Sequence, residues 1–190
     1  MNKVIFMSKG RRSLLAELAA YRPAGERERS MADSLAAFVA ATPDCFERSH
    51  PAGHVTGSAW IVDPALRAAV LVHHRRLGRW LQPGGHADGD PDARAVALRE
   101  AEEETGLRSL RPAAGGIYDV DVHEIPARPG EPAHLHYDLR FAFFADAGEA
   151  PRRNEESHEV AWVPLERLEA YGADASVMRL AAKTASLRRP

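Results

Sequence analysis

The sequence has little cysteine and lacks long apolar runs. Its one cysteine, Cys45, excludes a disulfide within the chain and a zinc site made of cysteines, and this composition fits a reducing compartment. The apolar run at residues 4–7 is too short for the core of a signal peptide, and no later run is long enough to span a bilayer. We therefore expect a cytoplasmic protein with no membrane partner.

The chain also lacks a strong excess of charge of either sign. Its formal net charge is −2 at pH 7, so it has no general basic surface of the kind that neutralises nucleic-acid phosphates. A nucleic-acid partner is therefore not expected. Hydrophobic residues make up 45% of the 190 residues, which is enough for the core of one compact domain.

The remaining pattern divides into a helical beginning and a longer part rich in short strands. Apolar stripes predict helices at residues 11–21 and 28–41. The later predicted strands and helices cover residues 55–62, 68–74, 91–105, 116–125, 134–145, 159–163, 164–171 and 175–187. We predict a helical extension at residues 1–45, followed at residues 46–190 by one α/β sandwich domain.

The helix predicted at residues 91–105 has clear signals at both ends. Asp90 suits the N-cap, Pro91 suits the first helical position, and Asp92 complements the helix dipole. Gly106 can adopt the left-handed conformation that ends a helix. The segment between them is therefore expected to be a regular helix.

Three glutamates gather on one face of that helix. Glu100, Glu103 and Glu104 are three and four residues apart, which brings them together at about 3.6 residues per turn. Their like charges repel, and a hard divalent cation, which prefers oxygen donors, would remove that repulsion. A solvated helix face would show the same glutamates, so the flanking residues must distinguish the two interpretations.

Those flanking residues resemble a known family motif. The segment from Gly85 to Leu107 is similar to the Nudix box, G-x5-E-x7-R-E-U-x-E-E-x-G-U, in which U is an aliphatic residue. The matching positions are Gly85, Arg99, Glu100, Ala101, Glu103, Glu104, Gly106 and Leu107. Pro91 stands where the motif has its first glutamate, and Asp90 and Asp92 are available to begin the helix instead. A looser similarity covers residues 54–171.

The resemblance implies a Nudix-type α/β/α sandwich with a mixed sheet, preceded here by the helical extension. It also implies that Glu100, Glu103 and Glu104 bind Mg²⁺, or Mn²⁺ as a substitute, together with the carbonyl oxygen of Gly84. Arg99 would orient the carboxylates through an ion pair. The family assigns these residues to catalysis.

Two further roles follow from the resemblance. Glu100 is the matching candidate for the general base. A further metal-binding carboxylate often comes from a later loop, for which Glu156 is the first candidate and Glu155 the second. Bound metal would neutralise a diphosphate and lower the pKa of an attacking water.

Polar residues alternate along two of the predicted strands. They are Asp119, Asp121 and His123 in one strand and His134, His136, Asp138 and Arg140 in the other. If the strands pair, these faces meet and form a substrate pocket, to which His86 would add its side chain beside the diphosphate. The alternatives are an outward solvated face and a histidine–carboxylate site for a transition metal.

The expected function is metal-dependent hydrolysis of a diphosphate linkage in a nucleoside diphosphate-X type or related small molecule, by water attack on phosphorus. One alternative is a non-catalytic Nudix module that binds a nucleotide-like ligand, although such modules usually lose these carboxylates. Another is an isomerase similar to isopentenyl-diphosphate isomerase, whose chemistry relies on a cysteine, and Cys45 lies outside the region that carries the motif.

The helical extension needs a partner for its apolar stripes. Two short helices cannot bury both stripes on each other and remain stable alone. They must pack on the sandwich domain or on a second subunit, and because many proteins of the family self-associate, a homodimer is expected.

Overall fold

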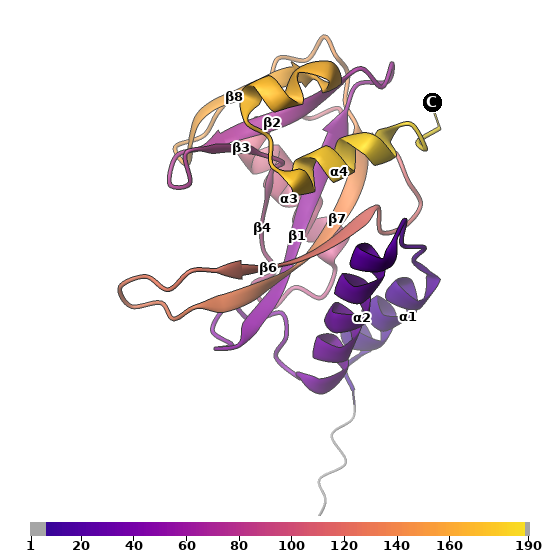
Figure 1. Cartoon of the computed structure of the whole chain (residues 1–190), viewed down its shortest axis with the longest axis vertical. Helices are drawn as coiled ribbons and strands as arrows, with labels where there is room; N and C mark the ends of the chain where they lie inside the picture. Colours follow the sequence, from indigo (N-terminus) through magenta and orange to yellow (C-terminus); the bar gives the residue numbers. More distant parts are fainter. Residues whose placement is uncertain (1–6, 189–190) are drawn as a thin grey trace, which may run out of the picture.

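The computed structural model describes residues 7–188, which form one sheet with helices on both sides (Figure 1). The helices are α1 (Lys9–Ala20), α2 (Glu26–Ala41), α3 (Ala93–Thr105), the 3-10 helix η1 (Leu165–Tyr171) and α4 (Ala175–Thr184). The strands are β1 (Gly53–Val62), β2 (Ala68–His74), β3 (Arg79–Leu81), β4 (Gly84–His86), β5 (Arg111–Pro112), β6 (Asp119–Ile125), β7 (His134–Phe144) and β8 (Ser157–Pro164). None of the helices within residues 7–188 has the length and apolar character needed to cross a membrane.

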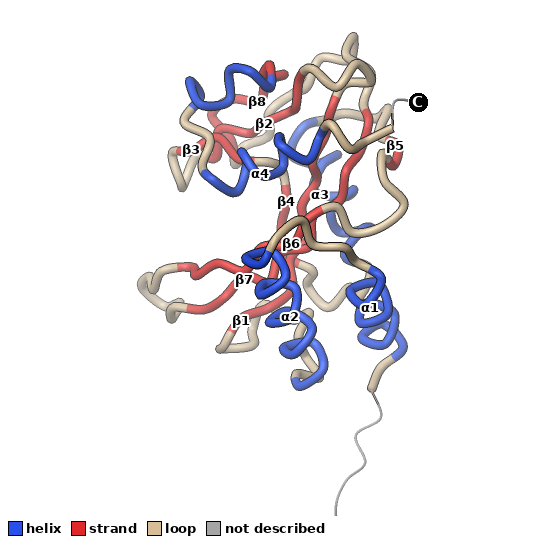
Figure 2. The backbone as a smooth tube through the Cα atoms, turned by 45° about the vertical axis from the view of Figure 1, so that its right-hand side comes forward, coloured by secondary structure: helices blue, strands red, loops and turns tan. Residues whose placement is uncertain are grey.

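Strand β1 is the centre of the sheet, and it is buried along its whole length. It pairs in parallel with β7, and its other edge pairs antiparallel with β2 at one end and with β4 at the other. The strand order β3-β2-β1-β7-β5, with β8 beside β2 and β6 beside β7, makes a mixed sheet. The hairpin of β6 and β7 projects from the body of the molecule (Figure 2).

Alternation along β1 divides the interior into two cores. Val55, Ala59 and Ile61 share one core with side chains of α1, α2 and α3. Trp60 and Val62 point to the other face and share a core with side chains of η1 and α4. The expected sandwich of a mixed sheet between helical layers is therefore confirmed.

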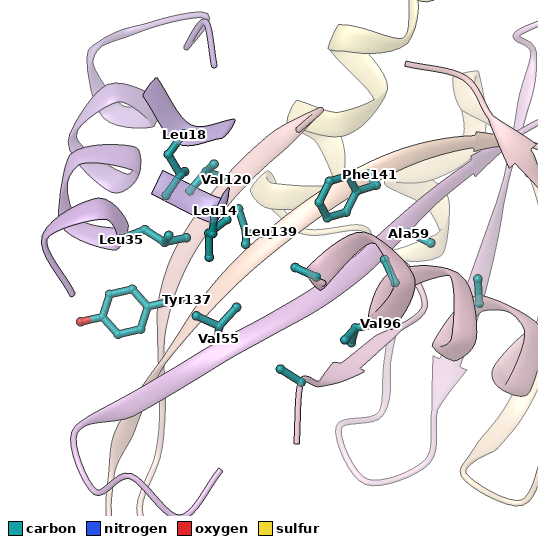
Figure 3. Close-up of a cluster of buried hydrophobic side chains, with 14 of the residues drawn as sticks. Leu14, Leu18, Leu35, Val55, Ala59, Val96, Val120, Tyr137, Leu139 and Phe141 are labelled. Carbon is teal, nitrogen blue, oxygen red and sulfur yellow. The ribbon is translucent and has the colours of Figure 1, made fainter. Parts of the chain in front are cut away.

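The N-terminal helices pack on the chain's own sheet. Leu14 and Leu18 of α1 and Leu35 of α2 lie in one core with Val120 of β6 and Leu139 of β7 (Figure 3). Within the described part of the chain, both apolar stripes are thus covered by the same molecule. The stripes therefore need no second subunit to cover them, which removes one of the two grounds for expecting a homodimer, and the homodimer stays a prediction.

Two contacts fix the position of α1. The buried guanidinium of Arg11 donates from Nε to the carbonyl of Val39 at 2.8 Å and from Nη2 to the carbonyl of Ala40 at 2.6 Å. These carbonyls belong to the last turn of α2 and have no partner inside that helix, so Arg11 satisfies them. Gly10 lies against Pro91, since a Cβ added at Gly10 would be 2.2 Å from the Pro91 Cβ.

The boundaries differ from the predicted ones at informative places. Helix α3 begins at Ala93 rather than at residue 91, because the side chain of Asp92 is the N-cap and accepts from the Ala95 N–H at 3.0 Å. The segment predicted as a helix from residue 164 is a 3-10 helix that starts at Leu165. Gly106 ends α3 with φ of 68°, as predicted. The short strands β3, β4 and β5 were not predicted.

Candidate active site

Helix α3, strand β4 and the turn before β8 surround a cavity of about 800 Å³. The acidic side chains that line it are those of Asp88, Asp90, Glu100, Glu103, Glu104, Glu155 and Glu156. Gly84, Gly85 and His86 line it from β4. The structure thus brings the metal-binding candidates of the motif together with Glu155 and Glu156, which come from a later segment of the chain.

Close approach of β4 to α3 depends on Gly85. A Cβ at this position would lie 2.5–2.8 Å from the carboxylate atoms of Glu100, so only glycine leaves room for that side chain. Arg99 connects the same two elements: its Nη2 donates to Glu100 Oε1 at 2.9 Å and to the carbonyl of His86 at 3.1 Å. The Arg99 ion pair therefore holds Glu100, its neighbour in the chain, against β4.

Glu104 is the most buried carboxylate of the cavity, at 6% exposure. Burial raises its pKa to about 8; a hydrogen bond from the Gly84 N–H at 3.1 Å opposes the shift, and the charges of Glu100, Glu156 and Glu103 add to it. Burial likewise raises the pKa of Glu100, although the hydrogen bond and the positive charge of Arg99 lower it. The carboxylates therefore repel one another in this site, and a bound cation would relieve the repulsion.

The donor set fits Mg²⁺. Carboxylates at Glu100, Glu103, Glu104 and Glu156 and the carbonyl of Gly84 are hard oxygen ligands, which Mg²⁺ and Mn²⁺ prefer. The absence of a side chain at Gly85 lets the Glu100 carboxylate lie directly against β4, beside the Gly84 carbonyl. The carboxylate cavity is therefore a candidate site for a divalent cation.

Basic side chains line the same cavity. Arg48, Arg75, Arg76 and Arg99 lie around it. Arg48 forms a two-pronged ion pair with Asp88, in which Nε donates to Oδ1 at 2.5 Å. Arginines of this kind bind phosphate oxygens well because the guanidinium matches them in shape and charge. The sequence analysis did not single out Arg48, Arg75 or Arg76, since isolated arginines carry no motif.

The two polar strands pair as predicted, antiparallel and with their polar faces together. Asp119 is opposite Arg140, Asp121 is opposite Asp138, and His123 is opposite His136. Asp119, Asp121, Asp138 and Arg140 are all buried. A solvated outward face is therefore wrong for these four side chains.

Most of the charged side chains on this face bind one another. Arg140 Nε donates to Asp138 Oδ2 at 2.8 Å, and its Nη atoms lie 3.3 and 3.4 Å from carboxylate oxygens of Asp119 and Asp121. Arg179 of α4 adds ion pairs of 2.8 Å to Asp119 and 2.7 Å to Asp121. Asp121 and Arg140, expected to bind substrate, are thus members of a buried ion-pair network.

A second cavity, of about 210 Å³, lies on the same face of the sheet. Of the residues expected to bind substrate, it is lined by His86, His123, His136 and Asp138. Asp138 accepts hydrogen bonds there from Thr56 at 2.9 Å and Ser58 at 2.8 Å. His134 is buried beside the other histidines but does not line this cavity.

The sequence analysis missed His54 on β1. This side chain lies next to His86, His134 and His136, with ring centroids 4.8–5.1 Å away. A signal was present in the sequence, because His54, Thr56 and Ser58 alternate along β1 and share one face.

Comparison with known proteins agrees with this description. The sequence matches the model of the NUDIX domain over residues 52–181. It is 37% identical over 116 residues to MutT4 of Mycobacterium tuberculosis, named as a mutator protein, covering 60% of this chain and 45% of that protein. It is 31% identical over 123 residues to the CMP-5'-(N-acetyl-N-hydroxy-3-aminopropyl)phosphonate hydrolase of Streptomyces rubellomurinus, covering 58% of this chain and 52% of that protein. The chain spans about half the length of the curated relatives it matches.

Solved structures share the fold at low sequence identity. A C. elegans Ap4A hydrolase superposes with a TM-score of 0.55 at 16% identity, covering 70% of this chain and 95% of that chain. The MutT protein of Methanosarcina mazei gives a TM-score of 0.54 at 20% identity, covering 72% of this chain and 96% of that chain. Because the family match spans more than half of the sequence and contains the carboxylate helix, this chain belongs to the Nudix hydrolase family.

Proposed function

We propose that this protein hydrolyses a diphosphate linkage in a nucleoside diphosphate-X type or related small molecule, in a reaction that depends on Mg²⁺. The observation that carries the proposal is one cavity lined by Glu100, Glu103 and Glu104 of α3, by Glu156 and by several arginines. Such a cavity suits a metal and an anionic substrate together. Family membership supports the same reaction class.

In this proposal the metal is held by Glu100, Glu103, Glu104 and Glu156 and by the Gly84 carbonyl. When bound, Mg²⁺ neutralises the diphosphate and lowers the pKa of a water. Mn²⁺ has the same preference for oxygen ligands and is expected to substitute.

The chain's own side chains position and activate the reactants. Glu100 is proposed to accept the proton of the water that attacks phosphorus. Arg99 fixes the carboxylate by its hydrogen bond to Oε1. Arg75 and Arg76, which line the same cavity, bind phosphate oxygens of the substrate and of the leaving phosphate.

The substrate class follows from the linkage and from the named relative. The Streptomyces relative is a hydrolase of a compound in which CMP is joined to a phosphonate. A nucleotide joined through phosphorus to a second group is therefore our proposed class. The test is a panel of nucleoside triphosphates, sugar nucleotides, dinucleoside polyphosphates and coenzymes, with product nucleotide and phosphate measured in heavy-oxygen water. We expect heavy oxygen in a product phosphate; binding of these compounds without any turnover would instead indicate a binding module.

Metal dependence is a separate prediction of the carboxylate cavity. Without a cation the four glutamates repel, so EDTA should abolish turnover and added Mg²⁺ should restore it. Turnover is measured for one active compound before and after dialysis against EDTA. Undiminished turnover in metal-free buffer would contradict the proposed role of the carboxylates.

A further inference from the structure

A group of histidines meets on the face of the sheet that points away from α3. The register explains why. His54 of β1 is directly opposite His136 of β7, and His136 is opposite His123 of β6. His86 of β4 pairs with Thr56, two residues from His54 on the same face of β1. Four strands from different parts of the sequence therefore place imidazoles side by side.

Three of these imidazoles have the spacing of a metal site. One ring nitrogen from each of His54, His86 and His136 can be chosen so that all three lie within 4.8 Å of one another. Zinc–imidazole bonds are about 2.0–2.1 Å long. Three imidazoles gathered this closely supply the nitrogen donors that such an ion needs.

Several buried ring nitrogens of this group have no hydrogen-bond partner among the described residues. His54 is 2% exposed, and neither its Nδ1 nor its Nε2 has a hydrogen bond to any described residue. The Nε2 atoms of His134 and His136 are buried and have no hydrogen-bond partner within residues 7–188 either. A buried polar group without a partner destabilises a fold by about 1–3 kcal/mol. Several such groups gathered at one place are therefore suited to a ligand that they share.

We propose that His54, His86 and His136 form a second metal site, distinct from the carboxylate cavity, which binds a first-row transition metal such as Zn²⁺. Three nitrogen donors select this class of ion, whereas Mg²⁺ requires oxygen donors. His86 and His136 line the cavity of about 210 Å³, which would leave room for a water or a substrate group beside an ion held by these rings.

The two sites are adjacent and have different proposed donor atoms, imidazole nitrogens in one and oxygens in the other. Gly84, His86 and Glu104 line both cavities, and Gly85 faces the Glu100 carboxylate. An ion at the histidines therefore adds positive charge beside the carboxylate cavity. This inference does not rest on the proposed hydrolysis, because it concerns binding by imidazoles alone.

The test is isothermal titration of the full-length protein with Zn²⁺ in the presence of excess Mg²⁺, which occupies oxygen sites. We expect one Zn²⁺ per chain. His54→Asn and His136→Asn should each weaken binding by more than the about 10–100-fold that loss of a second-shell contact causes. His158→Asn changes an exposed histidine outside the group and should bind as the wild type does. Glu103→Gln, which alters the carboxylate cavity, should also retain zinc binding.

X-ray absorption of the zinc-loaded wild type gives a result that does not depend on how the variants fold. We expect the multiple scattering of about three imidazoles around the metal. The proposal is overturned by absence of zinc binding in the wild type, by equal binding in His54→Asn, or by zinc binding that is lost in Glu103→Gln but kept in folded His54→Asn. Circular dichroism shows whether each variant is folded.

Discussion

Substitution of Glu103 distinguishes between a metal site and a helix surface that is merely charged. Its neighbour Glu102 has the same side chain on the same helix but pairs with Arg108 at 3.3 Å and does not line the cavity. Glu103→Gln keeps the shape and removes the charge that a cation needs. We expect it to lower kcat by more than about 1,000-fold, or about 4 kcal/mol, while circular dichroism remains unchanged.

The matched control is Glu102→Gln, for which we expect kcat within a factor of about two, because the change lies outside the cavity. Both variants are measured at saturating substrate and Mg²⁺. Equal kcat values for the two variants would show that these glutamates are only a solvated face of α3.

The residues of the carboxylate cavity could be predicted because a helix repeats every few residues, so Glu100, Glu103 and Glu104 share a face whatever surrounds them. The resemblance to a motif added Gly84 and Arg99. His54 could not be found in the same way. Its neighbours in space come from β4 and β7, and only the register of three strands brings them together. Register is a tertiary property that alternation within one strand does not fix.

Among the secondary-structure elements, α1 contacts the residue that the sequence comparison aligned with the first glutamate of the motif. Gly10 of α1 packs directly on this residue, Pro91. We predict that Gly10→Val destabilises the protein by about 1–3 kcal/mol, since the new side chain overlaps the Pro91 ring. Urea unfolding followed by circular dichroism measures the change.

Two further variants make this a test of the contact itself. Gly115→Val is the control, because a Cβ at Gly115 meets nothing within 4 Å. Pro91→Gly removes the ring that Gly10→Val would strike, so the double variant should recover most of the lost stability. Additive losses from Gly10→Val and Pro91→Gly would mean that the two residues do not interact.

Helix α4 is held to the sheet by charge as well as by apolar packing. Burial alone would raise the pKa values of Asp119 and Asp121. In Asp119 the hydrogen bond from Arg179 and the charge of Arg140 outweigh burial; in Asp121 the hydrogen bond from His123 and the same two arginines do so. Both pKa values are therefore lowered on folding, below the about 3.9 of an unfolded chain. The resulting stability is present above about pH 4 and is lost as the pH falls further.

Arg179→Met tests this arrangement. At pH 7 this substitution leaves the buried carboxylates of Asp119 and Asp121 with fewer partners. Because Arg140 still contacts both, we expect the free energy of unfolding to fall by an amount toward the lower end of about 3–5 kcal/mol. The loss should shrink toward pH 3 as the carboxylates take up protons. Arg167→Met, on the exposed side of η1, serves as the control. A loss that does not vary with pH would show that Arg179 acts through packing alone.

Elements with strong periodicity could be predicted from sequence, and those fixed by the surroundings could not. Strand β2 was predicted with its observed limits because its alternation and flanking turns are local features. Strand β4 is only three residues long, two of them glycines, and it exists because β1 supplies its hydrogen bonds. Helix α3 starts late because two aspartates compete for its N-cap, and Asp92 rather than Asp90 accepts from the first turn.

At the scale of the whole molecule, the N-terminal helices complete the fold. The apolar stripes predicted that these helices pack on another surface but not on which one, since any apolar surface can cover a stripe. In the structure the sheet is covered by Leu14, Leu18, Leu35 and Val39. Glu28 of α2 also reaches across to Lys183 of α4, which it contacts at 2.5 Å. Residues outside the family match therefore bind both to the sheet and to the last helix.

Deletion of residues 1–42 is the corresponding test. Burial of one leucine-sized side chain contributes about 1.5–3 kcal/mol, so the loss of these four approaches the about 5–15 kcal/mol that stabilises a typical domain. The deletion would also leave Lys183 without Glu28 and expose Val120 and Leu139. We expect the truncated chain to lose its cooperative thermal transition, bind a hydrophobic dye and aggregate. The intact chain, whose stripes are covered internally, should scatter light as a monomer, whereas an intact dimer that becomes a stable monomer on truncation would show that the helices serve a subunit interface instead.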